Sequence, residues 1–502
     1  MKVATQTCLV PCGIALTSGK LKTNSSKPKH NLPDSLLKQN CKKVSTLVTV
    51  TTRGADIAMR SVTFVDRCTL EVSGAIAQNG VCLGDVNGDG DHELVVGNDA
   101  GDLYVFKGSS GKVWRKCSDL GFITAVGVGD LFNCGHNVVV VVSGCGWVNI
   151  FDFSEDDEFV SSRPLHTQRI PANVKDLIIC DVNADGCTEL VVSLTDRVVR
   201  TYRWVSSPSF LPSPPPSLPG SPLSSTSDCQ TSTTGRLVSV NKWEFASQIG
   251  TVTLNTDTDG SPALLVAQPG GAFMKLRCSQ ETEVGDQGDT SSEGQGEMEE
   301  VLSNMSVEYE PLGVHRRRNP NVSAEILGGF ISNEDGPGTR YAIVTLDGTV
   351  LLVDHNSSKS PMDSIMWNLQ VDHQLMCLSK LDVTGDGMQE VIACSWDGQT
   401  YIISQDRQAV RFQFEESVAT FTAGKFSLSP GVTVPALVYV TFNNKIQVYH
   451  NIGLERGITL SSLVHWPGMR EEARDMLDTL GVDSSDMKQL QEVYRYCLYG
   501  VQ

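Results

Sequence analysis

Short apolar runs bounded by turns rich in glycine and aspartate recur along this chain roughly every 45 to 50 residues, a period typical of repeat architectures. Each unit contains a small residue, an Asp-rich turn, a run of the Glu-Leu-Val-Val type, a second turn, and a run in which aromatic and polar residues alternate. The clearest copies span 83–106, 181–202 and 382–403, and more degenerate copies span 129–151, 251–276, 328–353 and 424–449.

The two runs of each unit predict a pair of strands with different surroundings. The first run is uniformly apolar, which predicts a strand buried on both faces, and the second run alternates, which places it further out. One such sheet cannot bury both faces alone, whereas radial stacking of several copies can. The pattern therefore predicts an all-β fold, a seven-bladed β-propeller. A β-sandwich is the alternative, and the unit length and the number of copies favour the propeller.

The same pattern divides the chain into three parts. Residues 1–58 lack periodicity and are expected to form a flexible N-terminal extension, residues 59–450 are expected to form the propeller, and residues 451–502 a C-terminal helical segment. Two inserts within the propeller, 206–234 and 279–322, are rich in serine and proline or in acidic and polar residues. Such composition predicts disordered loops.

The C-terminal segment changes to a helical period. Apolar residues precede Gly481, a residue that commonly ends helices, and Leu490, Val493, Tyr494 and Leu498 then fall on one helical face. We expect a helical hairpin after the last blade. Two arrangements stay open: the hairpin packs on the propeller itself, or it is offered to a partner.

Composition narrows the classes of function. The formal net charge of −18 argues against nucleic acid as the main partner, because phosphate binding needs basic surfaces, and against electrostatic docking on an anionic membrane. The 15 cysteines are odd in number and lack a regular spacing, which indicates a reducing compartment rather than a disulfide framework. No apolar run has the length of a bilayer-spanning helix, so a direct membrane span is not expected.

Three of the Asp-rich turns have the spacing of calcium-binding loops. Oxygen-bearing side chains at alternate positions can converge on one ion, a glycine permits the sharp turn, and a glutamate follows at the ninth position. Hydrogen-bonded turns without any ion use the same residue types, so occupancy stays open. The candidate ligands are Asp85, Asn87, Asp89, Asp91 and Glu93 in the first turn, Asp181, Asn183, Asp185 and Glu189 in the second, and Asp382, Thr384, Asp386 and Glu390 in the third, where threonine weakens the pattern.

No arrangement of catalytic residues stands out. The chain lacks a Gly-x-Ser-x-Gly nucleophile elbow, a phosphate loop with Gly-Lys-Ser/Thr, and a His-Glu-x-x-His zinc motif. We therefore expect a protein that is not an enzyme and that requires no cofactor, with calcium as an optional one that would stiffen a hairpin.

The Asp-x-Asn-x-Asp-Gly-x-x-Glu-Leu-Val-Val units resemble the FG-GAP repeats of integrin α-subunit propellers. A closer resemblance, to the integrin-alpha FG-GAP repeat-containing family of the KICSTOR complex, covers most of the chain from Met59 onward. The segments that carry it are Met59–Val62, Ile170–Asn173, Thr195–Arg200, Gln370–Leu375, Trp396–Ile403 and Leu437–Asn443. Chains of that family begin at the equivalent of Met59, so residues 1–58 depart from it.

The resemblance implies a non-catalytic scaffold subunit. It implies pairing with kaptin within KICSTOR, recruitment of the GATOR complex to lysosomes, and restraint of target-of-rapamycin signalling when amino acids are scarce. The expected location is then cytoplasmic and peripheral on the lysosomal membrane, through the complex. The repeat taken by itself allows an alternative, a secreted or surface calcium-dependent adhesion propeller of the integrin-α type. Glycan occupancy at Asn321 would distinguish the two.

Overall fold

The computed structural model describes residues 59–154, 163–206, 234–257, 259–278, 306–310, 321–331, 338–354 and 364–454. The chain divides into two compact units, Met1–Thr46 and Leu47–Gln502, and every described residue belongs to the second. The predicted N-terminal extension and nearly all of the predicted C-terminal helical segment lie outside the described residues.

The described residues form antiparallel meanders in which consecutive strands are neighbours. The first two meanders share one eight-stranded sheet, joined where Asn79 of β3 pairs with Ala125 of β7. Their strands are β3 (Ile76–Gly84), β4 (Glu93–Asn98), β5 (Leu103–Phe106) and β6 (Val113–Cys117), then β7 (Ile123–Gly129), β8 (Val138–Ser143), β9 (Trp147–Phe151) and β10 (His166–Arg169).

Three four-stranded sheets follow. The first contains β11 (Val174–Cys180), β12 (Glu189–Leu194), β13 (Val198–Ser206) and β14 (Gly235–Glu244). The second contains β15 (Val252–Thr256), β16 (Pro262–Ala267), the short 3₁₀ turn η1 (Pro269–Gly271), β17 (Phe273–Arg277) and β18 (Ser306–Glu310). The third contains β19 (Ala324–Phe330), β20 (Arg340–Thr345), β21 (Thr349–Asp354) and β22 (Ile365–Gln370).

The last two sheets each include a strand from the start of the described chain. One contains β23 (Leu375–Leu381), β24 (Glu390–Ser395), β25 (Gln399–Ile403) and β26 (Ala409–Gln413), with β1 (Arg60–Ser61) parallel to β26. The other contains β27 (Val418–Ser429), β28 (Val432–Thr441) and β29 (Lys445–His450), with β2 (Arg67–Glu71) antiparallel to β29.

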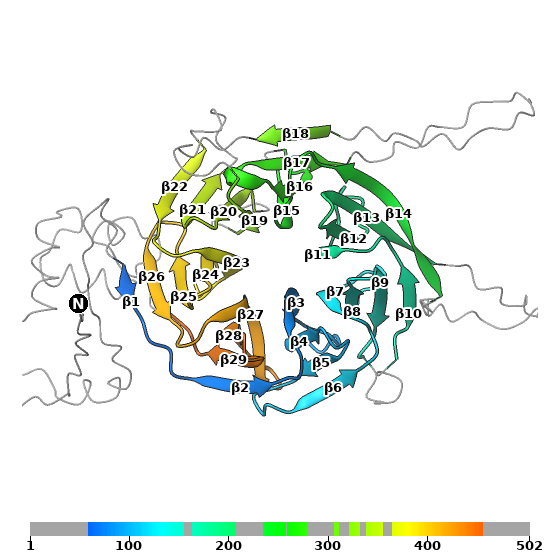
Figure 1. Cartoon of the computed structure of the whole chain (residues 1–502), viewed down its shortest axis with the longest axis horizontal. Coiled ribbons are helices and arrows are strands. Elements are labelled where there is room, and N and C mark those ends of the chain that lie inside the picture. The colour runs from blue at the N-terminus through cyan, green and yellow to red at the C-terminus, as the bar shows by residue number, and fades with distance from the viewer. Residues whose placement is uncertain are drawn as a thin grey trace, which may run out of the picture. The chain divides into compact units, whose positions relative to one another are not determined.

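The meanders are arranged in a closed ring, as a β-propeller requires (Figure 1). The first strand of each meander lies toward the middle and contacts the first strand of the next, and β27 returns to contact β3. Strand β2 supplies the outermost strand of the sheet that β27 begins, and its Leu70 is buried against the side chains of β28 and β29. Pairing β2 with β29 fastens the beginning of the described residues to their last sheet and so closes the ring.

The core lies between neighbouring sheets rather than within one layer. Strands β4, β8, β12 and β24 are buried at every position, which confirms the expectation from their uniformly apolar runs. Close approach of the inner strands explains some of the small residues: a Cβ on Gly127 of β7 would lie 2.3 Å from Leu177 of β11. Sheets that face neighbours on both sides need apolar residues on both faces.

Two expectations about elements need correction. The second run of each unit, which forms the third strand of a meander, was expected to alternate between buried and exposed positions. Strands β5 and β25 are instead buried throughout, because a fourth strand and the adjacent sheets cover them. The insert 279–322 was expected to be a loop, but its residues Ser306–Glu310 form β18 and pair with β17. Alternation of valine and tyrosine with polar residues in Ser-Val-Glu-Tyr-Glu supports a strand within this polar segment.

Helices are nearly absent from the part of the chain that the structure describes, where η1 is the one helical element. No helix among these residues is long and apolar enough to cross a membrane.

Candidate functional site

The three predicted calcium-like turns occupy equivalent places in the ring. Each joins the first and second strands of a meander: β3 to β4, β11 to β12, and β23 to β24. Because these meanders share one strand order, their turns open on the same side of the ring. The repeat pattern in the sequence therefore predicted equivalent positions correctly.

The first aspartate of each turn is held by backbone N–H groups of the turn itself. Asp85 accepts hydrogen bonds from Gly88 (2.7 Å) and Gly90 (2.9 Å). Asp181 accepts one from Gly186 at 2.8 Å, and Asp382 accepts from Gly385 (2.6 Å) and Gly387 (2.9 Å). These glycines adopt positive φ, from 71° to 84°, which aims their N–H groups at one carboxylate.

The glutamate at the ninth position closes each turn from the opposite end. One carboxylate oxygen of Glu93, Glu189 and Glu390 accepts the N–H of the residue that follows the first aspartate, at 3.2, 3.2 and 2.9 Å. The three glutamates are at most 4% exposed. Burying a carboxylate costs free energy unless it is paired. The side chain that binds the second carboxylate oxygen therefore determines whether each turn contains a neutralised ion pair.

In the first turn a lysine meets that oxygen. Lys107, directly after β5, places its Nζ 2.5 Å from Asp89 and 3.2 Å from Glu93. Burial by itself would raise the pKa of Asp89, but hydrogen bonds from Lys107 and Asn87 lower it below its usual value. Burial raises the pKa of Glu93, and the Val86 N–H and Lys107 oppose that shift.

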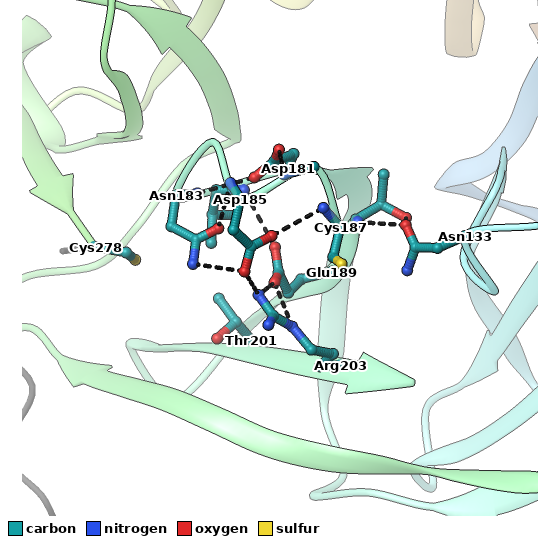
Figure 2. A network of polar contacts seen from close by, with 12 residues as sticks. Asn133, Asp181, Asn183, Asp185, Cys187, Glu189, Thr201, Arg203 and Cys278 are labelled. Carbon is teal, nitrogen blue, oxygen red and sulfur yellow. Dashed lines mark hydrogen bonds and ion pairs between the residues drawn. The ribbon is translucent and has the colours of Figure 1, made fainter. Parts of the chain in front are cut away.

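An arginine has the same position in the second turn (Figure 2). Arg203 of β13 donates from Nε to Glu189 at 2.8 Å and from Nη2 to Asp185 at 2.6 Å, and Nη2 also contacts Glu189. Asn183 donates to Asp185 at 3.1 Å from the other side. A planar guanidinium that binds two carboxylates is a strong, directional contact.

In the third turn, no basic side chain of the described residues forms an ion pair with the buried glutamate. The residue opposite Glu390 in the hairpin is Ser404, whose backbone and hydroxyl bind Gln408 of the next turn. Glu390 accepts from the Thr384 hydroxyl at 3.2 Å, and among the described residues no basic side chain forms an ion pair with it. Burial, opposed by the Val383 N–H and reinforced by Asp386, raises the pKa of Glu390 to about 7.

In the first two turns, a residue near the end of the turn binds a neighbouring meander. Both oxygens of Asp91 lie within hydrogen-bonding distance of the Gly431 N–H, at 2.9 and 3.3 Å, in the turn between β27 and β28. In the second turn, the Thr188 N–H donates to Asn133 at 2.7 Å. These contacts link turns of adjacent meanders around the ring.

These positions allow a test of the candidate calcium ligands. In the first two turns a protein cation lies between two of the carboxylates proposed as calcium ligands, and a calcium ion would have to displace it. Across the described part of the chain, no group of three or more His, Cys, Asp or Glu residues is placed to hold a metal ion. The third turn keeps its carboxylates but has threonine at a ligand position.

A further turn with the same chemistry was missed by the search for calcium-like spacing. Asp257, after β15, is 3% exposed and forms ion pairs with Lys275, at 2.6 Å, and with Arg277. Both cations come from β17, the third strand of that sheet. The signal in the sequence was two basic residues at alternate positions of an otherwise apolar strand.

A closed ring of antiparallel meanders with Asp-rich turns between first and second strands defines a β-propeller built from FG-GAP repeats. The FG-GAP repeat model matches residues 77–114. The model of integrin-alpha FG-GAP repeat-containing protein 2 matches residues 107–454, more than half of the chain. The chain therefore belongs to the family of integrin-alpha FG-GAP repeat-containing protein 2.

Curated relatives agree with this family. A protein of Mus musculus named "KICSTOR complex protein ITFG2" is 38% identical over 457 residues, which cover 88% of this chain and 96% of that protein. A protein of Bos taurus with the same name is 37% identical over 418 residues, which cover 79% of this chain and 72% of that protein.

Proposed function

We propose that this protein is a non-catalytic scaffold subunit of a KICSTOR complex. The observation that carries the proposal is the name of both curated relatives, which align over most of this chain and most of their own length. A ring of sheets whose Asp-rich turns hold their own cations or hydrogen bonds suits a rigid platform for partners. Stiff scaffolds present surface loops at fixed positions, which favours specific assembly.

We further propose the finer role that the family resemblance implies. The chain pairs with kaptin, helps to recruit the GATOR complex to lysosomes, and thereby takes part in amino-acid-dependent negative regulation of target-of-rapamycin signalling. Its location is then cytoplasmic and peripheral on the lysosomal membrane, held there through the complex.

The proposed architecture of this scaffold has seven blades. Two of the blades are the two meanders of the eight-stranded sheet, which meet through one residue pair of their inner strands. The other five sheets supply one blade each. The helical hairpin expected after residue 450 belongs to this proposal and lies outside the described residues.

The adhesion alternative is less favoured. A calcium-dependent adhesion propeller needs its turns free to bind calcium, whereas Lys107 and Arg203 already neutralise two of them. All ten described cysteines are free thiols, as expected of a chain that folds in a reducing compartment.

Co-expression with kaptin tests the proposal directly. We expect the two chains to elute together in size-exclusion chromatography and to capture further KICSTOR subunits from a mixture of them. Elution as two separate folded proteins, also in the presence of the remaining subunits, would contradict the scaffold role. A glycan at Asn321 in protein from animal cells would support the adhesion alternative instead.

A further inference from the structure

Two tryptophans are equally exposed on one side of the ring. Trp147, the first residue of β9, and Trp396, in the turn between β24 and β25, are each 44% exposed. Both lie where the second strand of a meander turns into the third. Because the meanders share one strand order, these turns all open on the side of the ring opposite the Asp-rich turns.

The chain covers the first tryptophan with its own arginine. Arg169, the last residue of β10, pairs in register with Trp147 and places its guanidinium carbon 5.9 Å from the centre of the indole ring. An arginine over the face of a tryptophan is a favourable cation–π contact. Trp147 is therefore already occupied within the molecule.

The second tryptophan has no such partner. Trp396 stacks on Phe442, with ring centres 6.1 Å apart and planes 10° from parallel, and Phe442 is itself 59% exposed. The last residue of β26, equivalent in place to Arg169, is Gln413, whose amide donates to backbone oxygens of Asp397 and Phe414. Among the described residues no cationic side chain lies over the Trp396 ring.

Four acidic residues lie in the turns and connections on this side of the ring. Asp397 follows Trp396 directly, and its side chain is 61% exposed. Glu415 and Glu416 lie in the connection from β26 to β27, which binds the tryptophan turn through the Val418 N–H and the Trp396 carbonyl at 2.9 Å. Asp372 is exposed in the connection from β22 to β23.

Basic side chains near these acids are His373, Lys445 and Arg67, and Arg67 of β2 lies within electrostatic range of Glu415 and Glu416. His373 places Nε2 3.5 Å from Asp397, a contact that is ionic only when the imidazole is protonated. Lys445, at the start of β29, lies opposite Glu71 of β2 in the register of the sheet. The region therefore combines exposed aromatic rings with four carboxylates, against two permanently charged basic side chains, Arg67 and Lys445.

We propose that this aromatic–acidic patch, formed by Trp396, Phe442, Asp397, Glu415, Glu416 and Asp372, binds an arginine-bearing segment of a partner protein. Arginine can lie flat on an indole while its fork binds carboxylates, which lysine does less well. The same molecule uses this solution at Trp147. Charge and aromatic surface both complement such a segment. The inference rests on the proposed scaffold role and names the chemistry of one docking segment.

The described part of the chain ends far from the aromatic–acidic patch, on the other side of the ring. The last described residue, Leu454, donates its N–H to the Val383 carbonyl at 2.9 Å, in the third Asp-rich turn. That turn lies on the opposite side of the ring from Trp396. A partner chain is therefore the occupant that the geometry favours.

Fluorescence anisotropy with the purified full chain tests the proposal. The probe is a fluorescein-labelled peptide of three Arg-Leu-Gly repeats, and a Glu-Leu-Gly peptide serves as the charge-reversed control. We expect Trp396→Ala and Phe442→Ala each to weaken binding of the arginine peptide about tenfold, the loss typical of a hot-spot aromatic residue. Neither substitution changes the net charge, so general attraction by this acidic protein stays constant.

Trp147→Ala is the matched control. It removes an equally exposed tryptophan that its own arginine already covers, and we expect less than a twofold change. Equal weakening by Trp147→Ala and Trp396→Ala, unchanged binding in both patch variants, or no binding to the wild type would overturn the proposal. Co-purification of the wild type with kaptin is scored separately, so a failed patch leaves the scaffold role standing.

Discussion

The second and third Asp-rich turns share a backbone framework but differ in the side chain that lies opposite the buried glutamate. Around residues 181–189, Arg203 bridges Asp185 and Glu189 (Figure 2). Around residues 382–390, Ser404 has the equivalent position and Glu390 has a threonine hydroxyl as its partner. Two turns that look alike as motifs therefore differ in what meets the buried glutamate: an arginine in one and a threonine hydroxyl in the other.

The difference shows that the motif alone does not define a calcium site. The residue opposite the ninth-position glutamate decides whether the carboxylates already have a cation. One degenerate repeat even exchanges the two charges: Arg340 of β20 pairs in register with Asp354 of β21, and Nε donates to the carboxylate at 2.9 Å. An ion pair at the base of this hairpin is thus a recurrent feature of the ring. The acidic residue lies on the second strand in some meanders and on the third strand in another.

The largest expected effect comes from removing the bridging arginine. Arg203→Met leaves Glu189 buried without its cation, and we expect a loss of about 2–3 kcal/mol in the free energy of unfolding. Urea unfolding followed by tryptophan fluorescence measures it. Arg236→Met, at an exposed position of β14, is the matched control and should change stability by less than about 0.5 kcal/mol. A loss of similar size in both variants would contradict the specific role of the bridge.

The same substitution should have opposite signs in the two turns, because burial raises the pKa of both glutamates but only Glu189 would lose an ion pair with arginine. At pH 8 we expect Glu189→Gln to destabilise by about 1–2 kcal/mol, because it breaks the pair with Arg203. Glu390→Gln should stabilise by roughly 2 kcal/mol, because it removes a buried charge without a cation. Destabilisation by both substitutions would show that Glu390 has a cation after all.

The effect at Glu390 should depend on pH. Its pKa is raised to about 7, so the folded state binds the proton more tightly than the unfolded state does. This contribution to stability is complete below the ordinary pKa of glutamate and is lost as pH rises through about 7. The stability difference between wild type and Glu390→Gln should therefore shrink from pH 8 to pH 5. A constant difference would place the pKa of Glu390 outside this range.

An arginine opposite Glu390 should give the third turn the kind of ion pair that the second turn has. Ser404→Arg introduces a guanidinium opposite Glu390, and we expect a gain of about 1 kcal/mol at pH 8. Ser404→Gln, which is similar in reach but neutral, is the control and should give little gain. Equal gains from both variants would mean that side-chain packing, and not charge, is responsible.

The smallest expected effect is that of calcium. We expect calcium binding at the first two turns to contribute nothing to the melting temperature, because protein cations lie among their carboxylates. Millimolar calcium should therefore have the same small effect, or none, on the melting temperatures of wild type and Arg203→Lys. Any stabilisation by calcium should arise at the third turn and disappear in Ser404→Arg. Stabilisation that persists in Ser404→Arg would restore the first two turns as calcium sites.

The local sequence predicted the turns well because their hydrogen bonds are local. Asp85 and Glu93 bind backbone groups within the same turn, so spacing along the chain was sufficient to find them. The bridging cation was in the sequence as well, since Lys107 follows Glu93 at the same distance at which Arg203 follows Glu189. Its meaning depended on the register of the hairpin, which a one-residue slip would have changed.

The strands β2 and β18 show a second limit. β2 pairs with β29, whose residues lie more than 370 positions away, and β18 lies within a polar segment. Neither strand has the apolar character of an inner strand, because each lies at the outer edge of its sheet. Their positions were therefore not visible as uniformly apolar runs, although Val307 and Tyr309 of β18 alternate with polar residues.

The sequence by itself determined the class of fold, the equivalent repeats and the places of the Asp-rich turns, because these follow from local periodicity and turn chemistry. Only the tertiary structure decided which cation meets each buried glutamate, which strand closes the ring, and that one exposed tryptophan is covered by arginine while the other is not. These outcomes depend on contacts between residues far apart along the chain, and such contacts exist only once the sheets are paired and the ring is closed.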